Sequence, residues 1–458
     1  MKGTIKAALL ALAVVAYAAP AYAVPGVDFF GYFRDGFAGN SKGGGMTCFK
    51  TPTMDYKLRL GNECDNYGEW GLEGVLVKED DGAVFTAGLM FNYDQDTAQP
   101  TGTATPFGIQ QNYFKAKFPQ WNGITFWGGK QYYERENIDM IDFFYLNTSD
   151  TGIGFENLDT GFGKLSFSVF SYKPVKGTPA ANTGADIAGF RPDLRLQGLP
   201  LGGFGTLMID VNVVSVSRNS TVLGPLPSDD TTTGWWFTLE HNYSGFLGNS
   251  SNTLTFQWAN AINSGMGNIS GLAGGTGFTT SLGGGATTDP LNKNNQQLRV
   301  LDWLMIAPNA QFQVGIGGMY QSKTWGNPGA SNITSQQYGL FARPYYWFSD
   351  YFLIQGDIGY TANTYSNSPV YTSAASAQDA NLTKFCIAPT LAPKVGNGQN
   401  GFWMRPQFRL FYTYGSWSSG ANHQNPPTGG SSPVNFASSA GGTATSGSTF
   451  GAQVEGWF

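Results

Sequence analysis

Charged side chains are scarce in this chain. Asp, Glu, Lys and Arg together make up 12% of its 458 residues, well below the ~25% that soluble proteins carry. The net charge of −5 argues against a nucleic-acid partner, which requires a basic surface. Apolar and flexible residues are abundant instead: 41% are hydrophobic, 15% are aromatic, and 63 are glycine. This composition favours a protein with a large surface in lipid.

Long apolar runs are also missing, except at the N-terminus. The first 23 residues combine Lys2 and Lys6 with an apolar run over 7–19 and a small-residue cleavage pattern at 21–23, which predicts a secretory signal peptide. No later segment approaches the ~20 continuous apolar residues of a membrane helix. The mature chain, residues 24–458, shows no internal boundary. We therefore predict one domain that crosses a membrane with strands rather than helices.

Apolar and polar residues alternate with a period of two in many short segments, for example 165–169 and 253–258, which predicts amphipathic β-strands. The clearest segment spans 402–414. One face carries Phe402, Met404, Phe408, Leu410, Tyr412 and Tyr414, and the other carries Trp403, Arg405, Gln407 and Arg409. The charged face cannot meet lipid, so we expect it to line a water-filled interior.

The connections between these segments are either tight or long. The long ones, rich in Gly, Ser, Thr and Asn, cover about 173–190, 261–293, 361–381 and 418–448. This pattern is typical of the short and long ends of an outer-membrane barrel. A soluble β-sandwich or β-helix is the alternative, but its last residue is unconstrained, whereas this chain ends on an aromatic, Phe458. The predicted fold class is an all-β, transmembrane antiparallel β-barrel in a bacterial outer membrane.

Three cysteines in an exported protein leave one without a partner. Cys48 and Cys64 lie in a short Gly-rich and polar stretch near the mature N-terminus, and we pair those two. Such a bridge would contribute about 3 kcal/mol in the loop-entropy model, and the periplasm is oxidising enough to form it. Cys386 lies in an apolar stretch and is expected to stay unpaired.

Residues for enzyme chemistry are hardly present. His241 lies in an alternating strand and His423 in a Gly/Pro-rich loop, so each is more plausible as a structural or solvated residue than as a catalytic base. No nucleophile, zinc or phosphate-binding motif is found. We assign no catalytic residue, no metal site and no cofactor.

The segment 130–147 differs from the other connections because it packs charges and aromatics together with no glycine. Folded into a barrel, it would narrow the channel and place Arg135 and Asp142 against the opposite wall, where a few charges set selectivity. The alternative is a solvated loop held by salt bridges.

Six stretches, in order along nearly the whole mature chain, match one known family. They are 27–34, 57–64, 127–145, 154–165, 298–302 and 451–458. In these stretches the chain resembles the maltoporin family. The resemblance implies an eighteen-stranded trimeric barrel, a disulfide in the first external loop corresponding to Cys48–Cys64, and a third loop folded inward as the constriction.

The resemblance also implies a lane of aromatic side chains along which linear oligosaccharides move. Tyr32, Tyr67, Trp403 and Trp457 match lane positions. Alternation independently places each of them on the polar, inward face of its strand. A further set matches polar-track and constriction positions: Arg34, Arg59, Glu69, Arg135, Asp142 and Phe144.

The chain departs from the family pattern at several positions. No tryptophan occurs between 93 and 106 to match the one that a neighbouring subunit donates, and Phe246 is the candidate for the missing lane phenylalanine. At the constriction, Phe144 replaces a tyrosine, and charged positions become Gly108, Asn137 and Asn147. Compared with the family pattern, the chain therefore has fewer side chains that can hydrogen-bond to sugar hydroxyls, but it keeps the aromatic side chains on which a sugar can stack.

We therefore predict a homotrimeric porin for passive, stereoselective diffusion of maltose- or maltodextrin-like oligosaccharides across the outer membrane, embedded in its lipid. One alternative is a general diffusion porin without saturable binding. Another is a barrel whose external loops act as a docking surface for a phage or host.

Overall fold

The computed structural model describes eleven stretches of the chain. They are 26–51, 54–96, 107–172, 187–218, 225–226, 228–264, 291–326, 331–366, 380–393, 401–423 and 444–458. The expected signal peptide lies outside these described residues. Within them, no helix has both the length and the apolar character needed to span a bilayer.

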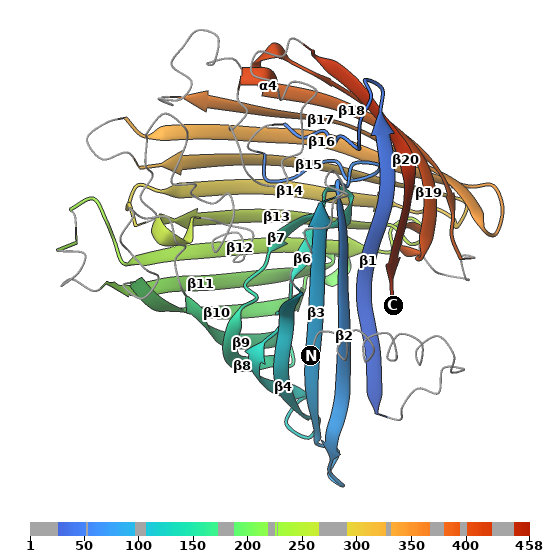
Figure 1. Cartoon of the computed structure of the whole chain (residues 1–458). Coiled ribbons are helices and arrows are strands. Elements are labelled where there is room, and N and C mark those ends of the chain that lie inside the picture. Colours follow the sequence, from blue (N-terminus) through green and yellow to red (C-terminus); the bar gives the residue numbers. More distant parts are fainter. Residues whose placement is uncertain are drawn as a thin grey trace, which may run out of the picture.

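Eighteen antiparallel strands form one closed sheet (Figure 1). Each strand pairs with its neighbours along the chain, and β1 (Val27–Asn40) closes the barrel by pairing with β20 (Ser446–Trp457). The others are β2 (Asp65–Lys78), β3 (Val84–Asp96), β4 (Gly108–Phe118), β5 (Ile124–Lys130), β8 (Thr151–Asp159), β9 (Lys164–Tyr172), β10 (Ile187–Pro200), β11 (Thr206–Arg218), β12 (Thr233–Ser244), β13 (Ser251–Asn260), β14 (Gln296–Ile306), β15 (Phe312–Trp325), β16 (Ile333–Trp347), β17 (Phe352–Ser366), β18 (Ala380–Leu391) and β19 (Gln407–Trp417). Closure leaves no unpaired sheet edge, which lipid would not tolerate. The predicted all-β barrel of eighteen strands is confirmed.

The alternation in the sequence becomes the two faces of this wall. On β13, Phe256 and Trp258 point outward and are exposed, whereas Thr255 and Gln257 point into the barrel and are fully buried. The last strand follows the same rule: Glu455 is buried inside, and Phe458 stacks on Phe29 outside with ring centroids 4.8 Å apart. Alternation of this kind gives lipid an apolar surface and the interior a polar one.

The predicted strand at 402–414 is wrong at its start. Pro406 has no N–H for the ladder, so pairing begins at Gln407, opposite Glu455. The preceding residues form a short 3-10 turn, η5 (Gly401–Trp403). Phe402, expected on the apolar outer face, is instead buried inside against Trp303 and Tyr345.

Three expected loops are shorter than predicted. Residues 187–190, 361–366 and 446–448 belong to β10, β17 and β20. The ends at 361–366 and 446–448 carry polar side chains on both faces, for example Ser446 and Ser448 with Thr449. The end at 187–190 contains no polar residue. Polar and apolar residues therefore do not alternate in any of the three.

Residues 46–51 and 54–64, which we call the first inward segment, pack against the inner faces of β16 to β19. The Tyr56 ring lies 6.4 Å from that of Phe341. Gly339 leaves the space that the Tyr56 hydroxyl occupies, because a Cβ there would clash with that oxygen. The Lys384 ammonium donates to the Leu60 carbonyl at 2.7 Å. Most of the connection between β1 and β2 therefore lines the interior instead of lying outside it.

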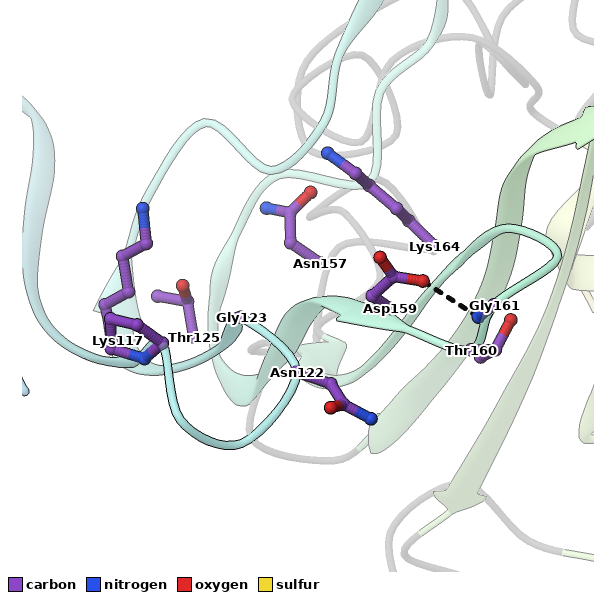
Figure 2. Close-up of a pocket in the computed structure, with 10 residues that line it drawn as sticks. Lys117, Asn122, Gly123, Thr125, Asn157, Asp159, Thr160, Gly161 and Lys164 are labelled. Carbon is purple, nitrogen blue, oxygen red and sulfur yellow. Dashed lines mark hydrogen bonds between the residues drawn. The ribbon is translucent and has the colours of Figure 1, made fainter.

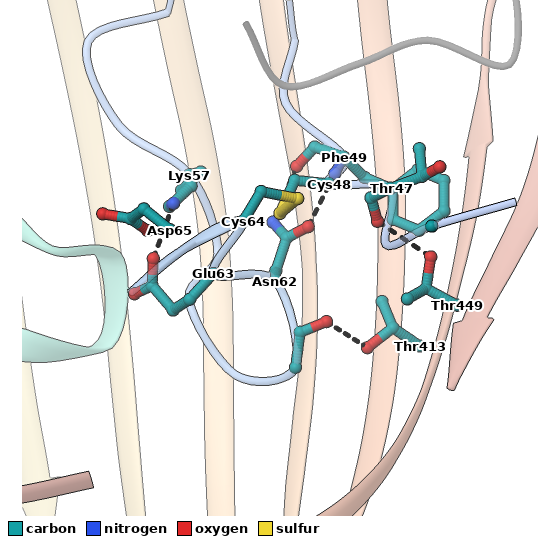
Figure 3. The surroundings of a disulfide bond; sticks show 12 residues. Thr47, Cys48, Phe49, Lys57, Asn62, Glu63, Cys64, Asp65, Thr413 and Thr449 are labelled. Carbon is teal, nitrogen blue, oxygen red and sulfur yellow. Dashed lines mark hydrogen bonds and ion pairs between the residues drawn. A yellow bond between two sulfur atoms is a disulfide. The ribbon is translucent and has the colours of Figure 1, made fainter. Parts of the chain in front are cut away.

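The Cys48–Cys64 disulfide joins the two ends of this segment, as predicted (Figure 3). The Asn62 side chain bridges the enclosed turn by bonding the backbone of Phe49 and of Leu58. Thr413 of β19 donates to the Gly61 carbonyl at 2.8 Å. Cys386 is free and buried.

Removal of this disulfide should loosen the first inward segment without unfolding the barrel. For Cys48→Ser combined with Cys64→Ser we expect a loss of about 3 kcal/mol, the loop-entropy contribution of a ring of this size. Backbone amides of 46–64 should then exchange faster with deuterium, while those of β12 to β14 stay protected. Unchanged exchange in 46–64 would show that wall contacts alone hold the segment.

Residues 131–150, the second inward segment, leave the wall between β5 and β8 (Figure 1). They contain β6 (Glu136–Ile138), η1 (Asp139–Ile141) and β7 (Phe143–Leu146). The Tyr145 hydroxyl donates to Glu240 on β12 at 2.8 Å, and Arg343 on β16 donates to the Met140 carbonyl at 2.9 Å. This segment therefore spans from one side of the barrel interior to the other.

The two inward segments meet and share an apolar core. The backbone N–H of Arg59 donates to the Met140 carbonyl at 3.0 Å, and the Tyr56 and Phe143 rings lie 5.9 Å apart. As a result, the inward side chains of β14 to β18 are buried. Among the described wall strands, the half-exposed inward aromatics lie on β20, β1 and β2.

Candidate functional site

The four predicted lane residues lie side by side on the open part of the interior. Trp403 and Trp457 have ring centroids 6.2 Å apart, as do Tyr32 and Tyr67. Trp457 and Tyr32 are cross-strand partners on β20 and β1, which links the two pairs. The order is Trp403, Trp457, Tyr32, Tyr67. Trp403 lies in η5 rather than in a strand, and its ring contacts those of Phe402 and Trp457.

A guanidinium group lies over each of the last three rings. Arg405 lies 4.1 Å from the Trp457 ring centroid, Arg59 5.6 Å from Tyr32, and Arg34 5.3 Å from Tyr67. A cation over a ring face is attracted by about 0.5–2 kcal/mol. These contacts hold the rings in fixed orientations.

The same arginines belong to one buried ion network. Arg59 pairs with Glu63, Asp139 and Glu455, each at 2.6 Å. Glu455 also binds Arg405 and Arg409. Three cations around Glu63, namely Arg34, Lys57 and Arg59, hold the pKa of that carboxyl at about 2 against the opposing effect of burial. The network joins both inward segments to the wall at β20.

Sequence reasoning missed Glu63 and Asp139, which are as central as the predicted arginines. Both are on connections, where no periodicity shows which side chains turn inward. The only signal was the spacing of Arg59 and Glu63, four residues apart, which has meaning only once the segment is known to fold inward.

Glu69 accepts hydrogen bonds from two tyrosines, Tyr67 on β2 and Tyr132 at the start of the second inward segment. Arg135 lies between two rings of its own segment, 3.2 Å from the Tyr132 centroid and 4.5 Å from Phe144. It therefore does not reach the opposite wall as predicted. Asp142 does cross the interior, because Arg34 donates to it at 3.4 Å.

The other positions that depart from the family pattern have local explanations. A Cβ at position 108 would meet the terminal oxygen of the Asn92 side chain, which would have to turn aside. Asn147 accepts a hydrogen bond from the Ser149 N–H at 3.2 Å. Phe246 stacks on Tyr243, an outward residue of β12, so the idea that it replaces the missing lane phenylalanine is wrong.

A polar cavity of ≈ 830 Å³ lies at the end of the barrel where the connections are short (Figure 2). The β4–β5 and β8–β9 turns form it, with Lys117, Asn157, Asp159 and Lys164 in its lining. Asp159 accepts from the Gly161 N–H at 2.8 Å, which fixes one turn. The cavity offers hydrogen-bond donors and acceptors at this mouth of the barrel.

A second cavity of ≈ 570 Å³ continues from it toward Glu136 of β6. Burial, and then the neighbouring carboxylates Glu240 and Glu134, raise the pKa of Glu136 to about 7, while Arg195 opposes the shift. Glu136 is therefore neutral in more than half of the molecules below pH 7 and ionised in more than half above it.

The charge of Glu136 should make the ion selectivity of the barrel depend on pH. Between pH 6 and 8 we expect the preference for cations to increase, because a carboxylate appears on the interior surface. Reversal potentials in a KCl gradient measure this directly, and Glu136→Gln should abolish the change. If the reversal potential of Glu136→Gln changes with pH as much as that of wild type, another group is responsible for the titration.

A closed barrel with an apolar outer wall and a charged, aromatic interior defines an outer-membrane β-barrel porin. The LamB porin family model matches residues 27–458, and the chain belongs to that family.

Several solved structures align over most of the chain at low identity. A loop L8 deletion mutant of OmpT, an outer membrane protein of Vibrio cholerae, is 10% identical with a TM-score of 0.35, covering 94% of this chain and 99% of its own. A mutant of Rh. blastica porin is 11% identical with a TM-score of 0.36, covering 94% and 100%. OccD3 (OpdP) of Pseudomonas aeruginosa is 9% identical with a TM-score of 0.44, covering 95% and 92%.

Proposed function

We propose that this porin conducts linear oligosaccharides of the maltose or maltodextrin type by passive, stereoselective diffusion. The observation that carries the proposal is the continuous order of Trp403, Trp457, Tyr32 and Tyr67 on the side of the interior that the inward segments leave open. No covalent step is required, and flux follows the concentration gradient.

The chemistry of a sugar fits this surface. A pyranose has apolar C–H faces, which stack on aromatic rings, and hydroxyls at its edge, which need donors and acceptors. Here the aromatic rings provide the stacking surface for the C–H faces. Glu69, Asp142 and the arginines over the rings provide the donors and acceptors for the hydroxyls. Conduction requires several weak sites rather than one tight site, which a row of similar rings supplies.

In this proposal the second inward segment forms the constriction. Phe144, Arg135 and Asp142 lie on that segment, and Asp142 meets Arg34 of β1 across the path. A sugar passing Tyr67 would meet these side chains next. Selectivity would then depend on the few donors and acceptors at this level rather than on the wide interior.

We also propose that three chains assemble through the outer face of β1 and its neighbours. Asp35, in the middle of β1, points outward beside Phe37 and is exposed. A carboxylate in the lipid-facing band is costly, whereas a subunit contact could shield it. Native mass spectrometry should show a trimer that Asp35→Trp weakens; a monomer would contradict this assembly.

Single-channel recording in planar bilayers tests the sugar path. Maltotriose, sucrose and a larger dextrin are added in turn, and saturable block that differs among them supports it. Uninterrupted current with every sugar would contradict it and favour a general diffusion porin. The alternative of phage or host docking concerns long connections that lie largely outside the described residues.

A further inference from the structure

We infer that the aromatic lane continues into the second inward segment through Tyr132, which forms a sugar subsite together with Glu69 and Arg135. This inference rests on the proposed function and names a residue that the lane pattern in the sequence does not contain. Tyr132 follows β5 directly and is half-buried, so part of its ring faces the open interior.

Tyr132 has the same two contacts that characterise the lane tyrosines. The hydroxyls of Tyr67 and Tyr132 both donate to Oε1 of Glu69, so the two side chains converge on one carboxylate. A guanidinium lies over each ring as well: Arg34 over Tyr67, and Arg135 over Tyr132. Tyr132 therefore continues the row by one position, toward the constriction.

Arg135 differs from the other arginines of the lane in its charge environment. Arg34, Arg59 and Arg405 are each paired with carboxylates. Within the described stretches Arg135 has no ion pair, and its guanidinium carbon lies 3.2 Å from the Tyr132 ring centroid and 4.5 Å from that of Phe144. A guanidinium held between rings keeps its N–H donors at the edge, where they can point to a ligand.

This arrangement makes a donor and an acceptor available at fixed positions around one ring. Arg135 can only donate, and Glu69, as a carboxylate, can only accept. Adjacent hydroxyls of a pyranose can bond to both at once only if their configuration matches. The Tyr132 subsite should therefore distinguish sugars that differ at one hydroxyl, whereas stacking on Trp403 should not.

Half-blocking concentrations for two trisaccharides that are epimeric at one hydroxyl test the inference in full-length porin. Tyr132→Leu removes the ring and the hydroxyl; we expect about tenfold weaker block by the preferred epimer, and an epimer ratio close to one. Tyr132→Phe keeps the ring under Arg135, so we expect a two- to threefold loss. Tyr113→Phe is the matched control, because its hydroxyl donates to Glu73 on the wall, away from Arg135.

The outcomes separate this inference from the proposed function. If wild-type current is not blocked by either sugar, the proposed function fails. If wild type is blocked but Tyr132→Phe and Tyr132→Leu keep its half-blocking concentrations and epimer ratio, only the Tyr132 subsite is overturned. A loss that is equal for both epimers in Tyr132→Leu would also overturn it, because a merely structural role weakens both alike.

Discussion

Replacement of Trp403 by alanine is expected to raise the half-blocking sugar concentration about tenfold, while ion conductance stays the same or increases. Trp403 is 42% exposed, and its ring is the first in the row of aromatic rings, next to Trp457. Loss of one aromatic stacking surface costs about 1–1.5 kcal/mol beyond buried area, which corresponds to this change in affinity. Conductance can increase because a smaller side chain leaves more room for ions.

A matched control is Trp235→Ala, since Trp235 is an exposed tryptophan on the outer face of β12. It should leave sugar block unchanged. If Trp403→Ala keeps the wild-type half-blocking concentration, Trp403 does not belong to the sugar path.

Replacement of Arg59 by alanine should weaken the attachment of both inward segments to the wall. Arg59 connects Glu63 of the first inward segment, Asp139 of the second and Glu455 of the wall. A buried acid left wholly unpaired costs about 3–5 kcal/mol. Because other cations remain near each of the three acids, we expect a loss of about 2 kcal/mol. The inward segments should detach more often, giving a noisier and larger current.

The measurements for this variant are the urea midpoint of unfolding and the variance of the open-channel current. Arg135→Ala is the informative comparison, because Arg135 has no ion pair within the described part of the chain. It should leave the urea midpoint near that of wild type. Equal midpoints for Arg59→Ala and wild type would show that the network does not hold the segments in place.

The barrel itself could be predicted from the sequence because a strand that separates lipid from water must alternate. Thr255 and Gln257, and likewise Glu455 and Trp457, turn inward for that reason alone. The last strand, β20, could be predicted because the same pattern continues to the end of the chain. The Cys48–Cys64 pair could be predicted from the cysteine count and the spacing.

The interior could be predicted only in part, since periodicity ends where strands end. The inward position of Phe402 depends on Pro406, which delays the start of β19, and on the space beside Tyr345. The place of Glu63 in the ion network depends on how the first inward segment folds. No local pattern encodes such long-range packing, so only the composition of 130–147 and the resemblance suggested that a connection turns inward.

The role of Tyr132 could not be predicted from the sequence either. In the sequence it is one aromatic among several in the segment 130–147. Only the fold places its hydroxyl on the carboxylate that Tyr67 also binds. A site that is formed jointly by a strand residue and a loop residue can be recognised only from the three-dimensional structure.

The central claim is that sugars move along the rings that the two inward segments leave open. A crystal structure of the porin soaked with a linear maltodextrin tests it most directly. We expect electron density for consecutive pyranose rings stacked on Trp403, Trp457, Tyr32 and Tyr67 and reaching Tyr132. Ordered sugar on another part of the interior, with these rings bare, would contradict the account.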